Sequence, residues 1–271
     1  MKANKIQHGG HRGLVVAIAA FAATAAVAGV VMCYGTLAGL YREQCVITDM
    51  AEQVEITSGK MVKPDVIAEN LGLKPGANLA EINFAEKRRE ILAKIPTLRT
   101  LSISRIMPNR LRVVAEERTP TAKLGIRGQR RISGRVVDSE GMVFICQRDT
   151  QLLPTIYEPL PPGIQPGHHI KSRMSAALQL IEACRDPEFA ELGVQDVDVS
   201  KPDYLLATLG DYSRLKIAWD EMDSPSAKSR KNLEDRLALL MKAVRTRVGT
   251  GARTWNATLS SGIFADTEEK N

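Results

Sequence analysis

The sequence predicts an α+β protein that is attached to a membrane by one N-terminal helix. Three observations support this prediction. The segment from Gly13 to Tyr41 is apolar and carries no charged side chain. Residues 53–120 follow the order strand, helix, helix, strand, strand. After residue 120, short strand patterns alternate with two longer helical patterns, which is typical of a second, mixed α/β domain.

The composition narrows the classes of function. Aromatic residues make up only 4% of the 271 residues, which argues against binding sites built on aromatic faces. The net charge is +6, but three of the 37 Lys and Arg lie in the short tail before the apolar segment, which contains no acidic residue. The other 34 nearly balance the 31 acidic residues, so no general affinity for nucleic acid is indicated.

The apolar segment at residues 13–41 predicts a transmembrane helix, because about 20 apolar residues cross the hydrocarbon core. Residues 1–12 contain Lys2, Lys5 and Arg12, so the positive-inside rule places this tail in the cytoplasm and the bulk of the chain outside. Gly35 and Gly39 are spaced for close packing against another helix. A signal peptide cleaved after Ala28 is the alternative, although it would leave an uncovered apolar stub.

The region after the membrane helix shows clear element boundaries. A strand pattern at "VEITSG" is followed by a helix that begins at Pro64 and ends at Gly72. A second helix begins after Asn83, which can cap it with Glu86 returning the bond, and Pro96 stops it. Two alternating segments then flank a turn at Pro108-Asn109. We expect two helices on one face of a three-stranded sheet.

Four short motifs follow one another along this region. They are G-x-N-L at Gly76, Asn78 and Leu79, I-P at Ile95 and Pro96, R-x-x-P-N-x-L at Arg105, Pro108, Asn109 and Leu111, and E-R-x-P-x-A at Glu117, Arg118, Pro120 and Ala122. The region resembles the POTRA domain of the bacterial cell-division family FtsQ/DivIB. Met107 stands where that family usually has tryptophan, a replacement that keeps the apolar bulk.

The remainder of the chain resembles the second, "β" domain of the same family. "VVDSEGMVF" at residues 136–144 and "LLPTI" at residues 152–156 match its strand and turn segments. Helices are expected at Ser172–Arg185 and Ser226–Val248, and a last strand, "RTWNATLSSGIFA", is expected within residues 253–265. The expected division is a cytoplasmic tail at 1–12, a transmembrane helix at 13–41, a POTRA domain at 50–120, a β domain at 121–264 that ends in an exposed edge strand, and a polar tail at 265–271.

No motif for catalysis, metal binding or a cofactor is found. His168 and His169 are adjacent in a proline-rich loop, where neighbouring side chains point apart. Glu116 and Glu117 are interpreted as the solvated end of a strand. The basic residues Lys123, Arg127, Arg130, Arg131 and Arg135 are interpreted as a solvated hairpin. A disulfide between Cys146 and Cys184 is left open.

The resemblance implies a non-enzymatic scaffold of the divisome in the inner membrane at the septum. Its partners would be of the FtsB/DivIC and FtsL type, and it would help to control septal peptidoglycan synthesis. In the family, a partner strand extends the end of the β domain. Here the fitting segment is Thr254–Gly262, with Trp255, Ala257, Leu259 and Ser261 on one face.

Three alternatives remain at this point. Trp255 and Leu259 are equally well explained as residues that complete the core. A POTRA-containing envelope assembly or secretion factor is a second function, but too few residues follow Pro120 for a β-barrel. A secreted, wall-associated protein would require cleavage of the apolar segment.

Overall fold

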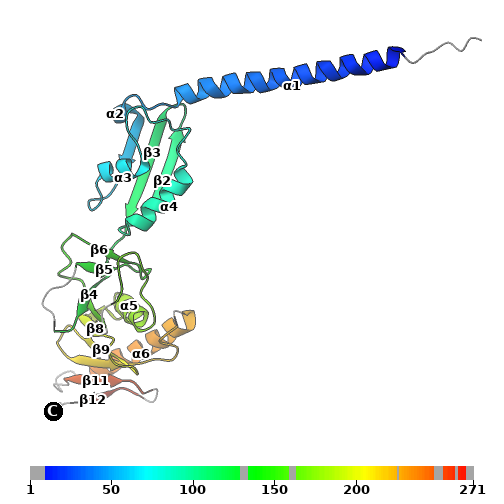
Figure 1. The fold of residues 1–271 in the computed structure, drawn as a ribbon. Helices are drawn as coiled ribbons and strands as arrows, with labels where there is room; N and C mark the ends of the chain where they lie inside the picture. The colour runs from blue at the N-terminus through cyan, green and yellow to red at the C-terminus, as the bar shows by residue number, and fades with distance from the viewer. Residues whose placement is uncertain are drawn as a thin grey trace, which may run out of the picture.

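A computed structural model describes residues 10–128, 134–158, 163–224, 226–246, 253–259 and 262–266. Figure 1 shows a long helix that leaves one end of a first domain, with a second domain at the opposite end of the first. We define the first domain as residues 45–118 and the second as residues 121–266. The C-terminal strand therefore lies at the end of the molecule farthest from the helix.

The N-terminal helix α1 spans Gly10–Gln44. Its segment Thr24–Gln44 is long and apolar enough to cross a membrane, and none of this segment is buried against the protein. Large apolar side chains such as Val31 and Leu37 are instead exposed along the helix. Because exposed apolar surface of this extent is unfavourable in water, the helix is suited to a lipid environment.

The first domain has the predicted order of elements. It contains α2 (Met50–Gln53), β1 (Val54–Thr57), α3 (Pro64–Leu71), α4 (Phe84–Lys94), β2 (Leu98–Ile106) and β3 (Arg110–Glu117). The described strands form a sheet in the order β1-β3-β2, with β1 parallel and β2 antiparallel to β3. Ile67 of α3 and Ile91 of α4 pack in one buried cluster with Leu101, Leu111 and Val113 of the sheet. The short helix α2 was not predicted.

The predicted helix boundaries of this domain are confirmed by their caps. Pro64 occupies the first turn of α3, and Gly72 ends it in the left-handed conformation at φ 75°. Asn83 accepts a hydrogen bond from the backbone N–H of Glu86 at 3.3 Å. Its side-chain amide donates to the Glu86 carboxylate at 3.2 Å, so the two residues satisfy each other at the start of α4.

The second domain is a single sheet against which two helices pack. Its elements are β4 (Ala122–Ile126), β5 (Arg135–Val137), β6 (Val143–Ile145), β7 (Thr155–Glu158), α5 (Arg173–Ala183), the 3₁₀ helix Ala190–Leu192, β8 (Asp196–Asp198), β9 (Leu205–Thr208), β10 (Arg214–Ile217), α6 (Ala227–Thr246), β11 (Thr254–Ala257) and β12 (Phe264–Asp266). The described strands form one sheet in the order β12-β11-β10-β9-β8-β7-β4-β5-β6. Leu180 of α5 and Leu237 of α6 belong to its main buried cluster.

The structure bears on three of the boundaries predicted for this domain. Helix α5 begins at Arg173, because Ser172 has a positive φ of 50° that lies outside the helical range. Helix α6 is described only to Thr246, and Val248 lies outside the described residues. The residues Ala265 and Asp266, which were assigned to a polar tail, belong to strand β12.

The disulfide left open by the sequence is absent. All four cysteines lie within the described residues and are free thiols. Cys146 packs against Met61 of the first domain, with 3.7 Å between the two sulfur atoms. Cys184 caps α5 inside the core of the second domain, where burial raises the pKa of its thiol to about 12. The two cysteines therefore serve different apolar clusters.

Candidate partner-binding edge

The two edges of the large sheet differ in whether other backbone covers them. At one edge, the N–H of Val143 in β6 donates to His168 O at 2.9 Å, and its carbonyl accepts from the N–H of Gly167 at 2.8 Å. A loop thus covers β6. At the other edge, β12 pairs with β11 on its inner side, and no strand in the described part of the chain lies on its outer side. An open strand edge is a template for pairing with another chain.

The open edge also carries exposed apolar side chains. Phe264 of β12 is 50% exposed, and Leu259, just after β11, is 54% exposed. Ala265 lies opposite Trp255 and packs against the buried core, so Phe264 projects from the opposite face. Arg236 of α6 donates through Nη1 to the carbonyl oxygen of Leu259 and holds this segment against the helix. The edge combines free backbone groups with apolar contacts.

The predicted partner-binding residues fall into buried and exposed positions. Trp255 and Ala257 are buried in the core, and only Leu259 is exposed. Ser261 lies outside the described residues. The exposed edge was expected at Thr254–Gly262, but the chain turns back after this segment and adds β12, so the edge lies one strand farther out. Phe264 and Ala265 were expected in the same strand as Trp255, whereas they belong to the separate strand β12.

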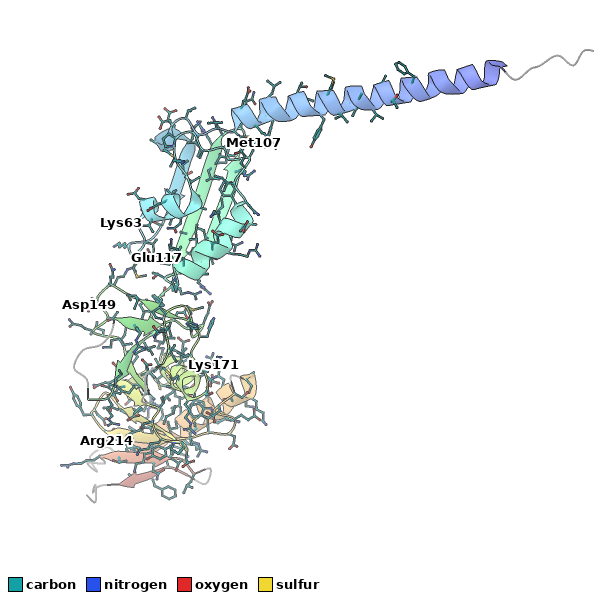
Figure 2. The ribbon with its side chains drawn as sticks, viewed as in Figure 1. Lys63, Met107, Glu117, Asp149, Lys171 and Arg214 are labelled. Atoms are coloured by element: carbon teal, nitrogen blue, oxygen red, sulfur yellow. The ribbon has the colours of Figure 1, made fainter. Side chains whose placement is uncertain are left out.

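A second feature, the junction between the two domains, was also missed. Figure 2 shows Glu117 at the end of the first domain that faces the second. Its Oε1 accepts from the N–H groups of Met61 and Val62 at 2.6 and 2.8 Å, and its Oε2 accepts from the N–H of Lys60 at 3.1 Å. Arg148 of the second domain donates to the same Oε2 at 2.8 Å. Glu117 was interpreted as solvated, but its side chain is only 6% exposed.

Arg118 makes the next link across this junction. Its Nη1 donates to Asp138 at 2.5 Å and to Glu140 at 3.1 Å, while its Nε donates to Pro96 O at 3.1 Å. Arg99 of β2 donates to the same Glu140 carboxylate. The hydrogen bonds from Arg99, which has the larger effect, and from Arg118 lower the pKa of Glu140. The E-R pair of the E-R-x-P-x-A motif therefore joins the two domains through charged hydrogen bonds.

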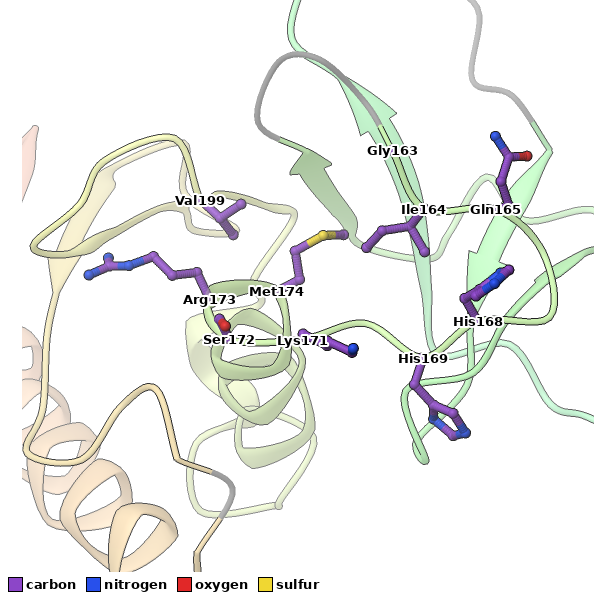
Figure 3. Close-up of a pocket in the computed structure, with 10 residues that line it drawn as sticks. All are labelled: Gly163, Ile164, Gln165, His168, His169, Lys171, Ser172, Arg173, Met174 and Val199. Carbon is purple, nitrogen blue, oxygen red and sulfur yellow. The ribbon is translucent and has the colours of Figure 1, made fainter.

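The remaining candidate groups lie elsewhere in the second domain. A cavity of about 600 Å³ lies beside the start of α5 and is lined by His168, His169, Lys171, Ser172, Met174 and other residues (Figure 3). Its described lining residues contribute no carboxylate or thiol. No group of three potential metal ligands is found among the described residues. Of the basic residues interpreted as solvated, Lys123 is buried and Arg127 pairs with Asp198, whereas Arg130 and Arg131 lie outside the described residues.

The arrangement of the first domain can now be compared with known families. Residues 50–118 match the family model described as the POTRA domain, FtsQ-type. The first domain is a POTRA domain of the FtsQ type. This confirms the resemblance to the FtsQ/DivIB family over these residues and relates the chain to a family of bacterial cell division. A comparison with curated proteins gave no match.

The motifs of the POTRA domain have structural roles in this chain. Asn78 of the G-x-N-L motif donates through Nδ2 to the carbonyl oxygen of Arg42 in the last turn of α1, at 3.1 Å. Its Oδ1 accepts from the N–H of Ala80 at 2.9 Å. The POTRA domain is thus bonded to helix α1 at one end and, through Glu117 and Arg118, to the second domain at the other.

Proposed function

We propose that this protein is a non-enzymatic scaffold of the bacterial divisome. It would bind membrane partners of the FtsB/DivIC and FtsL type and thereby help to control septal peptidoglycan synthesis. The observation that carries the proposal is an FtsQ-type POTRA domain placed between an apolar helix and a sheet with an open edge. The positive charges before the helix favour a single-pass topology with a cytoplasmic N-terminus.

The proposed binding site is the outer edge of β12. A partner segment in extended conformation would pair with the backbone of β12, and the apolar side chains of Leu259 and Phe264 would provide contacts specific to the partner. Trp255 and Ala257 would contribute indirectly, because their packing holds β11 and thus β12 in place.

The two bonded joints support a scaffold with a defined reach. The POTRA domain contacts α1 through Asn78 and contacts the second domain through Glu117 and Arg118. Because both joints use hydrogen bonds rather than a free linker, the β12 edge would be presented at a fixed distance from the membrane (Figure 1). A partner anchored in the same membrane would then find this edge at a constant height above the bilayer.

The membrane helix offers a further contact. Gly35 and Gly39 lie one turn apart on α1, and, apart from the adjoining turns of the helix itself, no described group lies within 4 Å of the position that a Cβ would take at either residue. The helix of a partner could approach closely at this point. We propose it as a supporting contact for the FtsL-type or FtsB/DivIC-type partner.

The proposal is tested in dividing cells with the full-length protein fused to a fluorescent tag. We expect accumulation at the septum and co-purification with the two partner types. The variant Phe264→Asp should reduce co-purification while the protein remains folded, since Phe264 is half exposed. Leu152→Asp is the matched control, because Leu152 is 99% exposed and far from the edge in sequence. Uniform envelope fluorescence without division partners would contradict the proposal.

A further inference from the structure

The turn between β2 and β3 lies against the end of the membrane helix. Tyr41, in the last turns of α1, donates from its hydroxyl to the sulfur of Met107 at 3.4 Å. Figure 2 shows Met107 beside the C-terminal end of α1. The turn is therefore located where α1 would leave a membrane, whatever else the protein binds.

This position is fixed by the backbone that follows the helix. The N–H of Ile47 donates to Ala77 O at 2.9 Å, and the N–H of Leu79 donates to Cys45 O at 2.9 Å. Cys45 and Ile47 are themselves buried in the core of the POTRA domain, at 2% and 0% exposure. The domain is thus bonded to the first residues after α1, and its β2–β3 turn cannot move far from the helix end.

The turn has the side chains of a membrane-interface segment. Ile106 and Met107 are 41% and 54% exposed, although both are apolar. Arg105 and Arg110 flank them, and no acidic residue occurs between Ser102 and Ala115. Arg105 is held in place by a hydrogen bond of 2.8 Å to Ile82 O and by the ring of Phe84 at 4.7 Å. Among the residues that the structure describes, no carboxylate forms an ion pair with Arg105.

We propose that the β2–β3 turn, residues 105–110, is a second membrane contact of this protein. Ile106 and Met107 enter the headgroup region of the bilayer that α1 crosses, and Arg105 and Arg110 bind anionic lipid headgroups. The inference rests on α1 being the membrane anchor, which is part of the proposed function. Its consequence is that the POTRA domain is held against the membrane surface at two points instead of pivoting on α1.

Fluorescence quenching in vesicles tests this contact with the full-length chain. An environment-sensitive probe is attached at Met107→Cys in a Cys33→Ala background, because Cys45, Cys146 and Cys184 are buried and Cys33 is exposed. Lipids brominated near the headgroup should quench the probe at position 107. A probe at Leu152→Cys, a fully exposed position of the second domain, should remain unquenched.

Changes in lipid charge and substitutions of the two arginines test whether the turn binds anionic headgroups. Quenching at position 107 should be stronger when phosphatidylglycerol is added to phosphatidylcholine vesicles. Each of the substitutions Arg105→Gln and Arg110→Gln should lower the ratio of docked to undocked turn by about fivefold in the anionic vesicles. Arg112→Gln is the matched control on β3, since Arg112 already pairs with Glu55 at 2.8 Å, and it should leave quenching unchanged.

Two results would overturn the inference, and they differ in what they say of the proposed function. If a probe on Cys33 of the natural chain is quenched by lipids brominated deep in the acyl chains, α1 is inserted. An unquenched probe at position 107 in both lipids would then exclude the turn as a membrane contact while leaving the anchor intact. An unquenched probe on Cys33 would remove the anchor and, with it, this inference.

Discussion

Arg118 of the POTRA domain and Asp138 of the second domain form a nearly buried ion pair with 2.5 Å between Nη1 and Oδ2. Their side chains are only 11% and 5% exposed. Asp138 also accepts from the N–H groups of Glu140 and Met142, so its carboxylate is held by both domains. This pair makes the orientation of the two domains a property of the fold and not of a flexible linker.

Removal of one partner of this pair should loosen the junction. We expect Arg118→Gln to lower the free energy of unfolding by about 3–5 kcal/mol, because it leaves the Asp138 carboxylate buried without its cation. Denaturant unfolding of Arg118→Gln, Asp138→Asn and the double variant gives the coupling energy. A coupling energy near zero would show that the pair does not hold the domains together.

The exposed pair of Arg112 and Glu55 is the control for that measurement. Both side chains are more than half exposed, and their atoms lie 2.8 Å apart. Because exposed pairs contribute little, Arg112→Gln should change the free energy of unfolding by less than about 1 kcal/mol. A similar loss in both variants would indicate that burial is not what gives Arg118 its effect.

Gly59 is expected to tolerate no side chain while Glu117 keeps its position. A Cβ at Gly59 would lie 2.1 Å from Oε2 of Glu117, and this carboxylate is bound by three backbone N–H groups and Arg148. Gly59→Ala should therefore cost about 1–3 kcal/mol of unfolding free energy through lost hydrogen bonds. The control Gly163→Ala should be nearly neutral, since, its chain neighbours aside, no group in the described part of the chain lies within 4 Å of its Cβ position.

The effect of Gly59→Ala should disappear when Glu117 is already removed. In a Glu117→Ala background the added methyl group has no carboxylate to displace, so the second substitution should have little further effect on unfolding. Equal costs of Gly59→Ala in both backgrounds would refute the proposed cause.

Trp255 and Phe264 should separate folding from binding at the edge. Trp255→Ala should lower the free energy of unfolding by about 3–5 kcal/mol, because Trp255 is 5% exposed and packs in the core. Phe264→Ala should leave unfolding nearly unchanged and weaken partner binding. Thermal unfolding and co-purification of both variants provide the comparison, and a stable Trp255→Ala variant would place this residue outside the core.

The thiol of Cys184 should make stability fall at high pH. Burial raises its pKa from 9.0 to about 12, so between these values the unfolded chain loses this proton while the folded chain keeps it. The folded state binds more protons there, and the free energy of unfolding should decrease as the pH rises from 9 to 12. Cys184→Ala should flatten this decrease in a series of denaturant titrations. If Cys184→Ala leaves this pH dependence unchanged, the decrease is not caused by the Cys184 thiol.

Local patterns were sufficient to predict the POTRA domain. Pro64, Gly72 and Asn83 determine helix ends through contacts within a few residues, and alternating residues determine β2 and β3. These signals are local, so they can be read without the rest of the chain.

The junction and the edge could not be predicted in the same way. Glu117 is the last residue of a strand, a position typical of a solvated residue, and contacts with the distant Gly59 loop and Arg148 bury it. The place of β12 depends on the chain reversing after β11, and three residues carry too short a pattern to reveal a strand. In both cases, contacts between segments far apart in the sequence decide the outcome.

Photo-crosslinking from the β12 edge tests the central proposal most directly. A photoreactive amino acid at Phe264 of the full-length chain should form crosslinks with a partner of the FtsB/DivIC type in dividing cells, and the same group at Leu152 should not. Both positions are exposed, so accessibility alone would not separate them. Equal crosslinking to such a partner from both positions, or none from Phe264, would contradict the assignment of this edge as the partner-binding site.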